Sequence, residues 1–314
     1  MTPDDLRAAA WQRLLALDPL LPAWHEPPAG CGATFTAADD SGRLTGVATC
    51  DHWTGEPGSM SLTWGAAHRF SLRPSVAGQD IGGALDQLIT KWQEHLAGIE
   101  EVKDADSAAV VTWPSRDVEG IRALLAHGLA PLAVIAARTA RSALPPFGRA
   151  DGITIRRAGP ADLDAVTDLG LDLVRYDAYF GEVVERPHTE EGLRRDCEGL
   201  LAGPAPWAWL AERDGVPVGL VVTEPPETAQ WIAPLTGLSP VAYLQQGIVR
   251  TAERASGIGA DLVAHCHAEL DAAGIAITLL HYSQANPLSV PFWSQQGYRP
   301  LWTTWEARPA LNLR

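Results

Sequence analysis

The chain has 314 residues, of which 46% are hydrophobic and 20% are charged, and this balance excludes a disordered or fibrous chain. At about 150 residues per domain, the length suggests two domains. The formal net charge of −14 argues against a nucleic-acid partner, and no apolar run is long enough to cross a membrane. The cysteines are isolated and the first residues are acidic, which argues against secretion, so we expect a cytoplasmic protein.

The first half of the chain alternates between helical and strand periodicity. In chain order, the pattern predicts a helix over 4–16, strands over 33–40, 44–50 and 61–72, a helix over 82–97, a strand over 107–113, a helix over 117–127 and a strand over 130–139.

Two prolines and two glycines in the segment 141–152 indicate a linker. After it, the pattern predicts a strand over 153–158, helices over 160–174 and 189–202, a hairpin over 206–224, a strand over 241–250, a helix over 257–273, a strand over 275–282, a helix over 287–296 and a strand over 298–306. The order of elements repeats, which indicates an internal duplication. We therefore expect two domains of one fold, residues 1–147 and 148–314.

The segment from Val249 to Ala260 leaves an apolar strand and enters an apolar helix. The free N–H groups at a helix N-terminus bind anions. Gly257 and Gly259 would let a phosphate approach the backbone, and Arg254 adds a positive charge. This arrangement predicts an anion site, although a tight turn without a ligand is the alternative. The dinucleotide-binding pattern fits poorly, because its third glycine position is Leu262.

This segment resembles the acetyl-CoA signature of the GCN5-related N-acetyltransferases (GNAT), (Gln/Arg)-x-x-Gly-x-(Gly/Ala). A second motif of that family resembles the residues from Asn286 and Ser289 through Phe292-Trp293 to Gly297-Tyr298. The order of elements from 152 to about 308 is also similar. The resemblance implies an α/β (α+β) class with tandem GNAT folds, each a mixed, mostly antiparallel sheet flanked by helices.

The resemblance further implies that acetyl-CoA is the co-substrate and that no metal takes part. The turn amides would bind the pyrophosphate, the strand backbone would pair with the pantetheine arm, and Asn286 with the following helix would hold the thiol end. The residues expected at the cofactor are Ile248, Val249, Arg254, Ala255, Ser256, Gly257, Ile258, Gly259, Ala260, Asn286, Ser289, Phe292 and Trp293.

The first half has the same order of elements, but its versions of the two motifs have lost several of the characteristic residues. The residues from Leu72 to Gly82 align with those from Val249 to Gly259 without a gap. This places Ala77 at the position of Arg254 and Asp80 at that of Gly257. Asp117 similarly takes the place of Asn286. A carboxylate repels a pyrophosphate, so we expect this half to have lost cofactor binding.

The catalytic groups follow less directly from the sequence. The resemblance implies a tyrosine that protonates the departing thiolate, but Trp293 stands there, and an indole is no useful acid. Either coenzyme A leaves as a thiolate stabilised by hydrogen bonds, or another group protonates it; Tyr282 and Ser283, at the end of a strand, are the candidates for that group, with an aromatic of the sheet as the favoured alternative for Tyr282. Glu224, at the end of the hairpin, is the candidate base, with a solvated residue before Pro225 as the slightly favoured alternative and a water chain to solvent as another route for the proton. Asp177, Glu182 and His188 lie in the segment that lines the acceptor pocket in this family.

These observations predict an enzyme that transfers an acetyl or other acyl group to a primary amine of a small molecule or peptide, with its active site in the second half. The alternative is a non-catalytic acyl-CoA-binding, regulatory or peptide-binding module. The sequence His265-Cys266-His267 is not expected to bind a metal, because residues i and i+2 of a helix face apart. We expect no nucleic-acid or membrane partner, and the oligomeric state stays open.

Overall fold

The computed structural model describes residues 2–22, 32–140 and 150–314. Its first half contains α1 (Pro3–Leu17), β1 (Thr34–Ala38), β2 (Leu44–Thr54), β3 (His68–Val76), α2 (Ile81–Leu96), β4 (Ser107–Pro114), α3 (Ile121–Ala126) and β5 (Ala130–Thr139). Its second half contains β6 (Ile153–Arg157), α4 (Leu163–Asp177), α5 (Thr189–Leu201), β7 (Ala208–Arg213), β8 (Val216–Glu224), β9 (Val241–Val249), α6 (Ile258–Ala272), β10 (Ile277–Ser283), α7 (Ser289–Gln295) and β11 (Arg299–Ala307).

Local chemistry explains several of these boundaries. Thr2 and Asp5 form a capping box at the start of α1, with Pro3 in its first turn. Asp214 and Gly215 both have positive φ, which gives the tight turn that joins β7 to β8. The predicted linker falls mostly outside the described residues.

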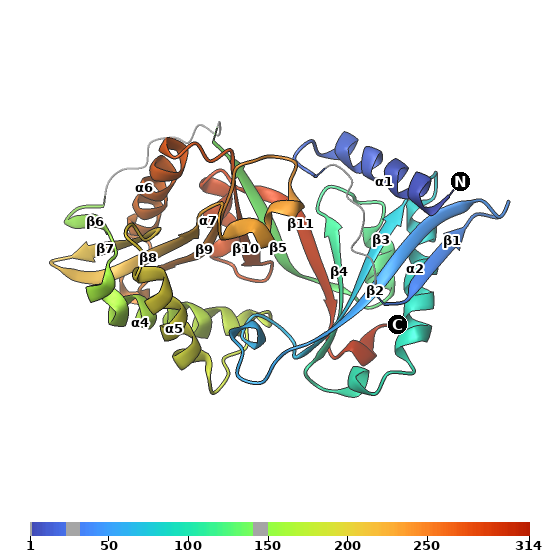
Figure 1. Ribbon diagram of the computed structural model, residues 1–314, viewed down its shortest axis with the longest axis horizontal. Coiled ribbons are helices and arrows are strands. Elements are labelled where there is room, and N and C mark those ends of the chain that lie inside the picture. The colour runs from blue at the N-terminus through green and yellow to red at the C-terminus, as the bar shows by residue number, and fades with distance from the viewer. Residues whose placement is uncertain (1, 23–31, 141–149) are drawn as a thin grey trace.

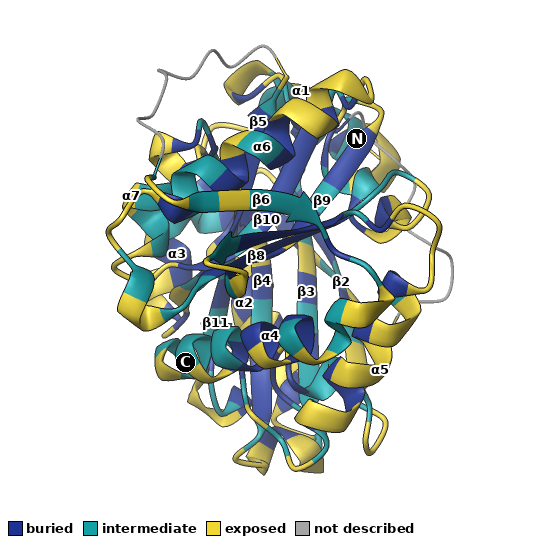
Figure 2. Ribbon diagram, turned by 90° about the vertical axis from the view of Figure 1, so that its left-hand side faces the viewer, coloured by how far each residue is buried: buried dark blue, intermediate teal, exposed yellow. Residues whose placement is uncertain are grey.

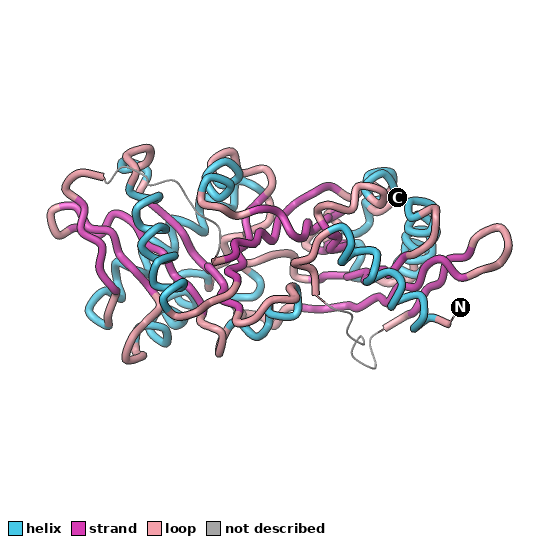
Figure 3. The backbone as a smooth tube through the Cα atoms, turned by 90° about the horizontal axis from the view of Figure 1, so that it is seen from above, coloured by secondary structure: helices cyan, strands magenta, loops and turns pink. Residues whose placement is uncertain are grey.

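The strands form one continuous sheet. In the part of the chain that the structure describes, it has eleven strands in the order β1-β2-β3-β4-β11-β5-β10-β9-β8-β7-β6. Only the β3–β4 and β9–β10 pairs are parallel, and the remaining pairs are antiparallel. The predicted class, a mixed and mostly antiparallel sheet flanked by helices, is confirmed (Figures 1 and 3).

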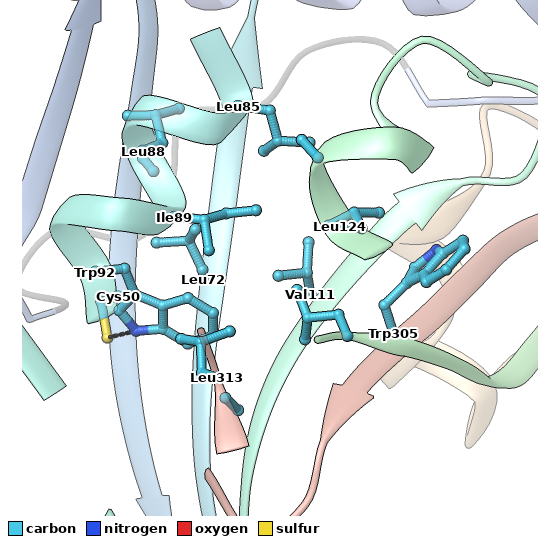
Figure 4. Packing of buried hydrophobic residues seen from close by; sticks show 14 of the residues in the cluster. Cys50, Leu72, Leu85, Leu88, Ile89, Trp92, Val111, Leu124, Trp305 and Leu313 are labelled. Atoms are coloured by element: carbon cyan, nitrogen blue, oxygen red, sulfur yellow. Dashed lines mark hydrogen bonds between the residues drawn. The ribbon is translucent and has the colours of Figure 1, made fainter. Parts of the chain in front are cut away.

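The two halves exchange their last strands. β11, the last strand of the chain, lies between β4 and β5, and β5 pairs on its other side with β10. The cores are exchanged in the same way. Trp305 and Leu313 pack with Leu72, Trp92 and other side chains of the first half, where the Trp92 indole donates to the Cys50 sulfur (Figure 4).

Helices cover both faces of this sheet (Figure 2). In the second half, α4 and α5 cover one face and α6 covers the other. In the first half, α2 and α3 pack on one face, while α1 packs on the other through Leu6 and Ala10.

The predicted strand over 61–72 is wrong in its first part. Residues Met60–Leu62 form a 3₁₀ turn, and β3 begins only at His68. The intervening backbone bonds to the other half of the chain: the Thr63 carbonyl accepts from the Val184 N–H at 2.8 Å, and the Leu62 carbonyl accepts from Arg186 at 3.1 Å. Tertiary hydrogen bonds therefore replace the sheet pairing that the local pattern suggested.

The strand exchange predicts that neither half folds alone. Expressed separately, residues 1–147 would lack β11 and residues 148–314 would lack β5, which leaves unpaired strand edges next to open cores. We expect insoluble or unfolded fragments, whereas the full chain should unfold in one transition by circular dichroism and by tryptophan fluorescence. A soluble second fragment with native-like near-ultraviolet dichroism would contradict this expectation.

Candidate functional site

The sheet opens between β9 and β10. The two strands pair in parallel only over residues 241–244 and 277–280. The register between β8 and β9 shifts at the same level, since Val222 pairs with Gln246 and Thr223 with Leu244. Gln245 is therefore a bulge residue, and such a residue bends its strand. The end of β9 diverges from β10, so no strand of the described chain pairs with its backbone on that side.

A sharp turn follows β9 and leads into α6. Ala255 and Gly257 both have positive φ, at 62° and 90°. Gly257 is the N-cap of α6, and among the described residues no side chain caps this end. The first N–H groups of a helix have no intrahelical acceptor, so this terminus presents donors and a positive dipole.

A cavity of about 510 Å³ lies at this opening. Its lining combines the end of β9, the turn, the start of α6 and α7, and the end of α4. Of the thirteen residues predicted at the cofactor, twelve line it: Ile248, Val249, Arg254, Ala255, Gly257, Ile258, Gly259, Ala260, Asn286, Ser289, Phe292 and Trp293. The exception is Ser256, whose hydroxyl donates to the Glu253 carbonyl at 2.6 Å.

Arg254 lies along the wall of this cavity. Its Nε donates to the Val249 carbonyl at 3.1 Å, and its guanidinium stands 4.3 Å from the centre of the Tyr176 ring. The positive charge is thus held beside the anion-binding turn by a hydrogen bond and a cation–π contact.

Asn286 organises another part of the cavity wall. It is buried, and its side-chain oxygen accepts from the N–H groups of Leu288 and Ser289, which fixes the start of α7. Its Nδ2 donates to Asp177 at 3.3 Å. Burial raises the pKa of Asp177 to about 6, although the Asn286 bond and the Arg254 charge act in the opposite direction. Asp177 is therefore a carboxyl group that titrates near neutrality inside the cavity.

Trp293 fills the place where the family resemblance implies a tyrosine. It is buried, and a Cβ on Gly247 would lie 3.1 Å from its ring. The glycine in β9 thus makes room for the indole. The ring also makes an edge contact with Tyr298 at 5.4 Å.

The three predicted catalytic residues do not line the cavity. Glu224 accepts from the Trp231 indole at 2.8 Å, and burial raises its pKa. Tyr282 packs in the core beneath α6, and burial raises its pKa as well. Ser283 points to the opposite face of the sheet, because neighbouring strand residues alternate. Its Oγ is buried and has no hydrogen-bond partner among the described residues.

Two further acids, Asp177 and Glu182, have raised pKa values. Asp177 lines the cavity, and Glu182 comes just after Gly181, beyond the end of α4. Burial and the charges of Asp177 and Glu306 raise the pKa of Glu182 to about 7. The sequence places Asp177 and Glu182 in a segment between two helices, but it has no signal for the approach of Glu306 from β11. His188 instead contacts the Ser59 carbonyl at 3.0 Å, away from the cavity.

Other kinds of site are not found in the described residues. They contain no cluster of three or more potential metal-binding His, Cys, Asp or Glu side chains. None of their helices is both long and apolar enough to cross a membrane.

Comparison with known proteins identifies the region that holds the cavity. Residues 174–298 match the model of the acetyltransferase (GNAT) family. The chain contains a GNAT domain. No curated protein matches the chain by sequence.

Solved structures show the same fold over nearly the whole chain. A GCN5-related N-acetyltransferase from Sphaerobacter thermophilus has 16% identity and a TM-score of 0.61, with 98% of this chain and 94% of that chain covered. A GNAT-family acetyltransferase from Colwellia psychrerythraea has 12% identity and a TM-score of 0.52, with 98% and 96% covered. At these identities the likeness shows the fold alone.

The first half has the frame of the GNAT domain, but its own side chains occupy the corresponding positions. Asp80 is the N-cap of α2, as Gly257 is of α6, and its Oδ1 accepts from the Gly83 N–H at 2.7 Å. Asp117, aligned with Asn286, is buried and forms a two-pronged ion pair with Arg13 of α1. A carboxylate of the protein thus takes the place where the GNAT domain leaves a helix end uncapped.

A second cavity of about 600 Å³ lies between α1 and the sheet, lined mostly by the first half and also by Trp231, Leu235 and Trp302 of the second. β3 and β4 diverge beyond Leu72 and Val111, much as β9 and β10 do. No residue of α2 lines this cavity, whereas the first residues of α6 line the cavity beside β9. It therefore lacks the contribution of a helix N-terminus.

The raised pKa of Asp177 predicts a cost in stability. The folded state favours the protonated carboxyl, so the free energy of unfolding should fall as pH rises from about 4 to above 6. One pKa unit corresponds to ~1.4 kcal/mol, and partial exposure of this side chain reduces the effect. We expect Asp177→Asn to stabilise the protein by about 1 kcal/mol at pH 7.5 in urea denaturation, and to have little effect at pH 4.

Asp168→Asn is the matched control, because Asp168 is an exposed carboxylate on the same helix. It should change the free energy of unfolding little at either pH. Equal effects of the two substitutions at pH 7.5 would show that Asp177 carries no special cost.

Proposed function

We propose that this chain transfers an acetyl group from acetyl-CoA to a primary amine, at the cavity between β9 and β10. The observation that carries the proposal is the continuous lining of that cavity. It joins an uncapped helix N-terminus to the Asn286–Asp177 pair. An anion site and a polar pair in one cavity suit a phosphate-bearing thioester.

The described residues fit the donor. The N–H groups of Ile258 and Gly259 would bind the pyrophosphate, with Arg254 adding charge. At the end of β9 the backbone groups of Gly247 and Val249 face away from β8, and they would pair with the pantetheine arm as an additional strand would. A volume of about 510 Å³ is in the range of small-molecule sites.

The chemistry that these residues can supply is binding, orientation and stabilisation of charge. When bound, acetyl-CoA would supply an activated acyl group. Trp293 has an N–H that donates but cannot act as an acid, so it would hold the departing sulfur by a hydrogen bond at most. The buried Ser283 hydroxyl has an open bonding position and is the remaining donor among the three predicted catalytic residues.

The first half would then act as a support. We propose that residues 1–147 form a GNAT-like domain that no longer binds acetyl-CoA, and that residues 148–314 form the catalytic one. The Asp80 cap and the Arg13–Asp117 pair support this assignment, because they place protein groups at the equivalent binding positions.

A second candidate function is a non-catalytic acyl-CoA-binding module. Its support is the position of Glu224 and Tyr282, neither of which lines the cavity, together with Trp293 in place of a tyrosine. Release of free CoA from acetyl-CoA in the presence of a panel of primary amines separates the two functions. Amine-dependent release supports the enzyme, and binding without release supports the module.

The binding step is tested with Gly257→Asp. The added carboxylate would face the pyrophosphate at the start of α6, so we expect acetyl-CoA affinity to fall about 100-fold or more in isothermal titration calorimetry. The wild-type chain should bind one molecule, because only the second half keeps the open helix end.

Gly274→Asp is the control, since Gly274 lies just beyond the other end of α6 with a similar φ of 77° and nothing near its missing side chain. It adds the same charge and a comparable backbone strain to the same helix, and should bind acetyl-CoA as the wild type does. Unchanged binding by Gly257→Asp, or no binding by the wild type, would refute the proposal.

A further inference from the structure

The segment between α4 and α5 carries a carboxylate that no described cation neutralises. Glu182 has no ion pair with any Lys, Arg or His that the structure describes, and the charges that act on it are those of Asp177 and Glu306, both acids. A half-buried carboxylate beside like charges is costly. Such a group has a physical reason to exist where a ligand supplies the missing positive charge.

The backbone around this residue is fixed from both sides. The Gly181 carbonyl accepts from Arg308 at 3.2 Å, and the Val184 N–H donates to the Thr63 carbonyl at 2.8 Å. Arg308 follows β11, and Thr63 belongs to the first half. Arg308 of the second half and Thr63 of the first half therefore fix the backbone on either side of Glu182.

The neighbouring sheet face offers a second open polar group. In the register of the central strands, Ser283 of β10 lies opposite Ala133 of β5, which lies opposite Thr304 of β11. Glu306 is two residues farther along β11, and so lies on the same face. Ser283 is only 5% exposed and its hydroxyl has no partner among the described residues, while the Glu306 side chain is 9% exposed.

We propose that Glu182 binds the ammonium group of the acceptor and takes its proton, in a site bounded by Asp177, Ser283 and Glu306. Asp177 belongs to the donor cavity, so this site lies next to the thiol end of the bound donor. The inference rests on the proposed function, and it assigns to Glu182 the role of base that the sequence assigned to Glu224.

The proton and electron balance is complete without another reactant. One ammonium proton passes to the Glu182 carboxylate, and the amine lone pair forms a bond to the thioester carbon. The C–S bond breaks, and its electron pair leaves with the sulfur. The second amine proton goes to that sulfur and gives free CoA, with Ser283 as a donor within the same site, and Glu182 returns its proton to solvent.

The groups around Glu182 raise its pKa and so make its carboxylate a stronger base, as this role requires. A carboxyl group with a pKa of about 7 is roughly half ionised at neutral pH, so it can both take up and release a proton there. Asp177, Glu306 and Tyr243 face Glu182 from α4, β11 and β9, while the cations Arg254, Arg69 and Arg308 act on these acids. Since Glu182 must be ionised in the free enzyme, kcat/KM for the amine should rise with pH through an apparent pKa near 7.

Glu182→Gln tests this assignment. We expect kcat/KM for the amine to fall about 100-fold or more and the rise near pH 7 to disappear, with acetyl-CoA affinity unchanged in calorimetry. Glu182→Asp should keep a pH-dependent rate. Glu185→Gln is the control, because Glu185 is an exposed residue of the same segment that pairs with Arg175 at 3.0 Å, and it should leave the profile unchanged.

Glu306→Gln gives a readout that a purely structural role would not produce. Removal of this like charge should move the rise in kcat/KM to lower pH, since the Glu306 carboxylate raises the pKa of Glu182. A Glu182→Gln enzyme that keeps the rise near pH 7 and a rate within threefold of wild type overturns the assignment while acetyl-CoA binding and turnover stand. A wild-type chain that binds no acetyl-CoA overturns the proposed function itself, and this inference with it.

Discussion

The exchange of β5 and β11 is the constraint on which the remaining structure depends. Each strand completes the sheet of the half to which it does not belong in sequence, so the two halves share one hydrogen-bonded sheet. Trp305 and Leu313 complete the first core, and Val134 and Ala136 complete the second. A break between the halves would therefore expose two strand edges and two cores. This shared seam also brings Glu306 of β11 toward Glu182, which the order of residues along the chain keeps far apart.

The same strand geometry has opposite consequences in the two halves. In each, a parallel pair of strands diverges beyond a few residues and a helix begins just after the first strand of the pair. In the second half Gly257 leaves the helix end open, and Asn286 with Asp177 forms a polar part of the cavity wall. In the first half Asp80 bonds to its own helix, and Arg13 pairs with Asp117. A few side chains thus decide which opening can receive an anionic ligand.

The sequence predicts local structure well and tertiary contacts poorly. The strand over 130–139 and the helix over 4–16 follow from local periodicity, and the glycine pattern around Gly257 marks the turn, so twelve of thirteen predicted cofactor residues line one cavity. Periodicity could not show that β5 and β11 are exchanged, because an apolar strand has the same pattern beside any neighbour. The approach of Glu306 to Glu182 depends on the strand exchange and leaves no local signal.

Amide hydrogen exchange in the presence of acetyl-CoA tests the central claim most directly, because it reads both halves of one chain in one experiment. The account predicts slower exchange over residues 247–260, where the strand end, the turn and the first turn of α6 would bind the donor. Residues 72–83, the aligned segment of the first half, should exchange at the same rate with and without acetyl-CoA. Protection of the first-half segment, or unchanged exchange at both, would contradict the claim that only the second half binds the donor.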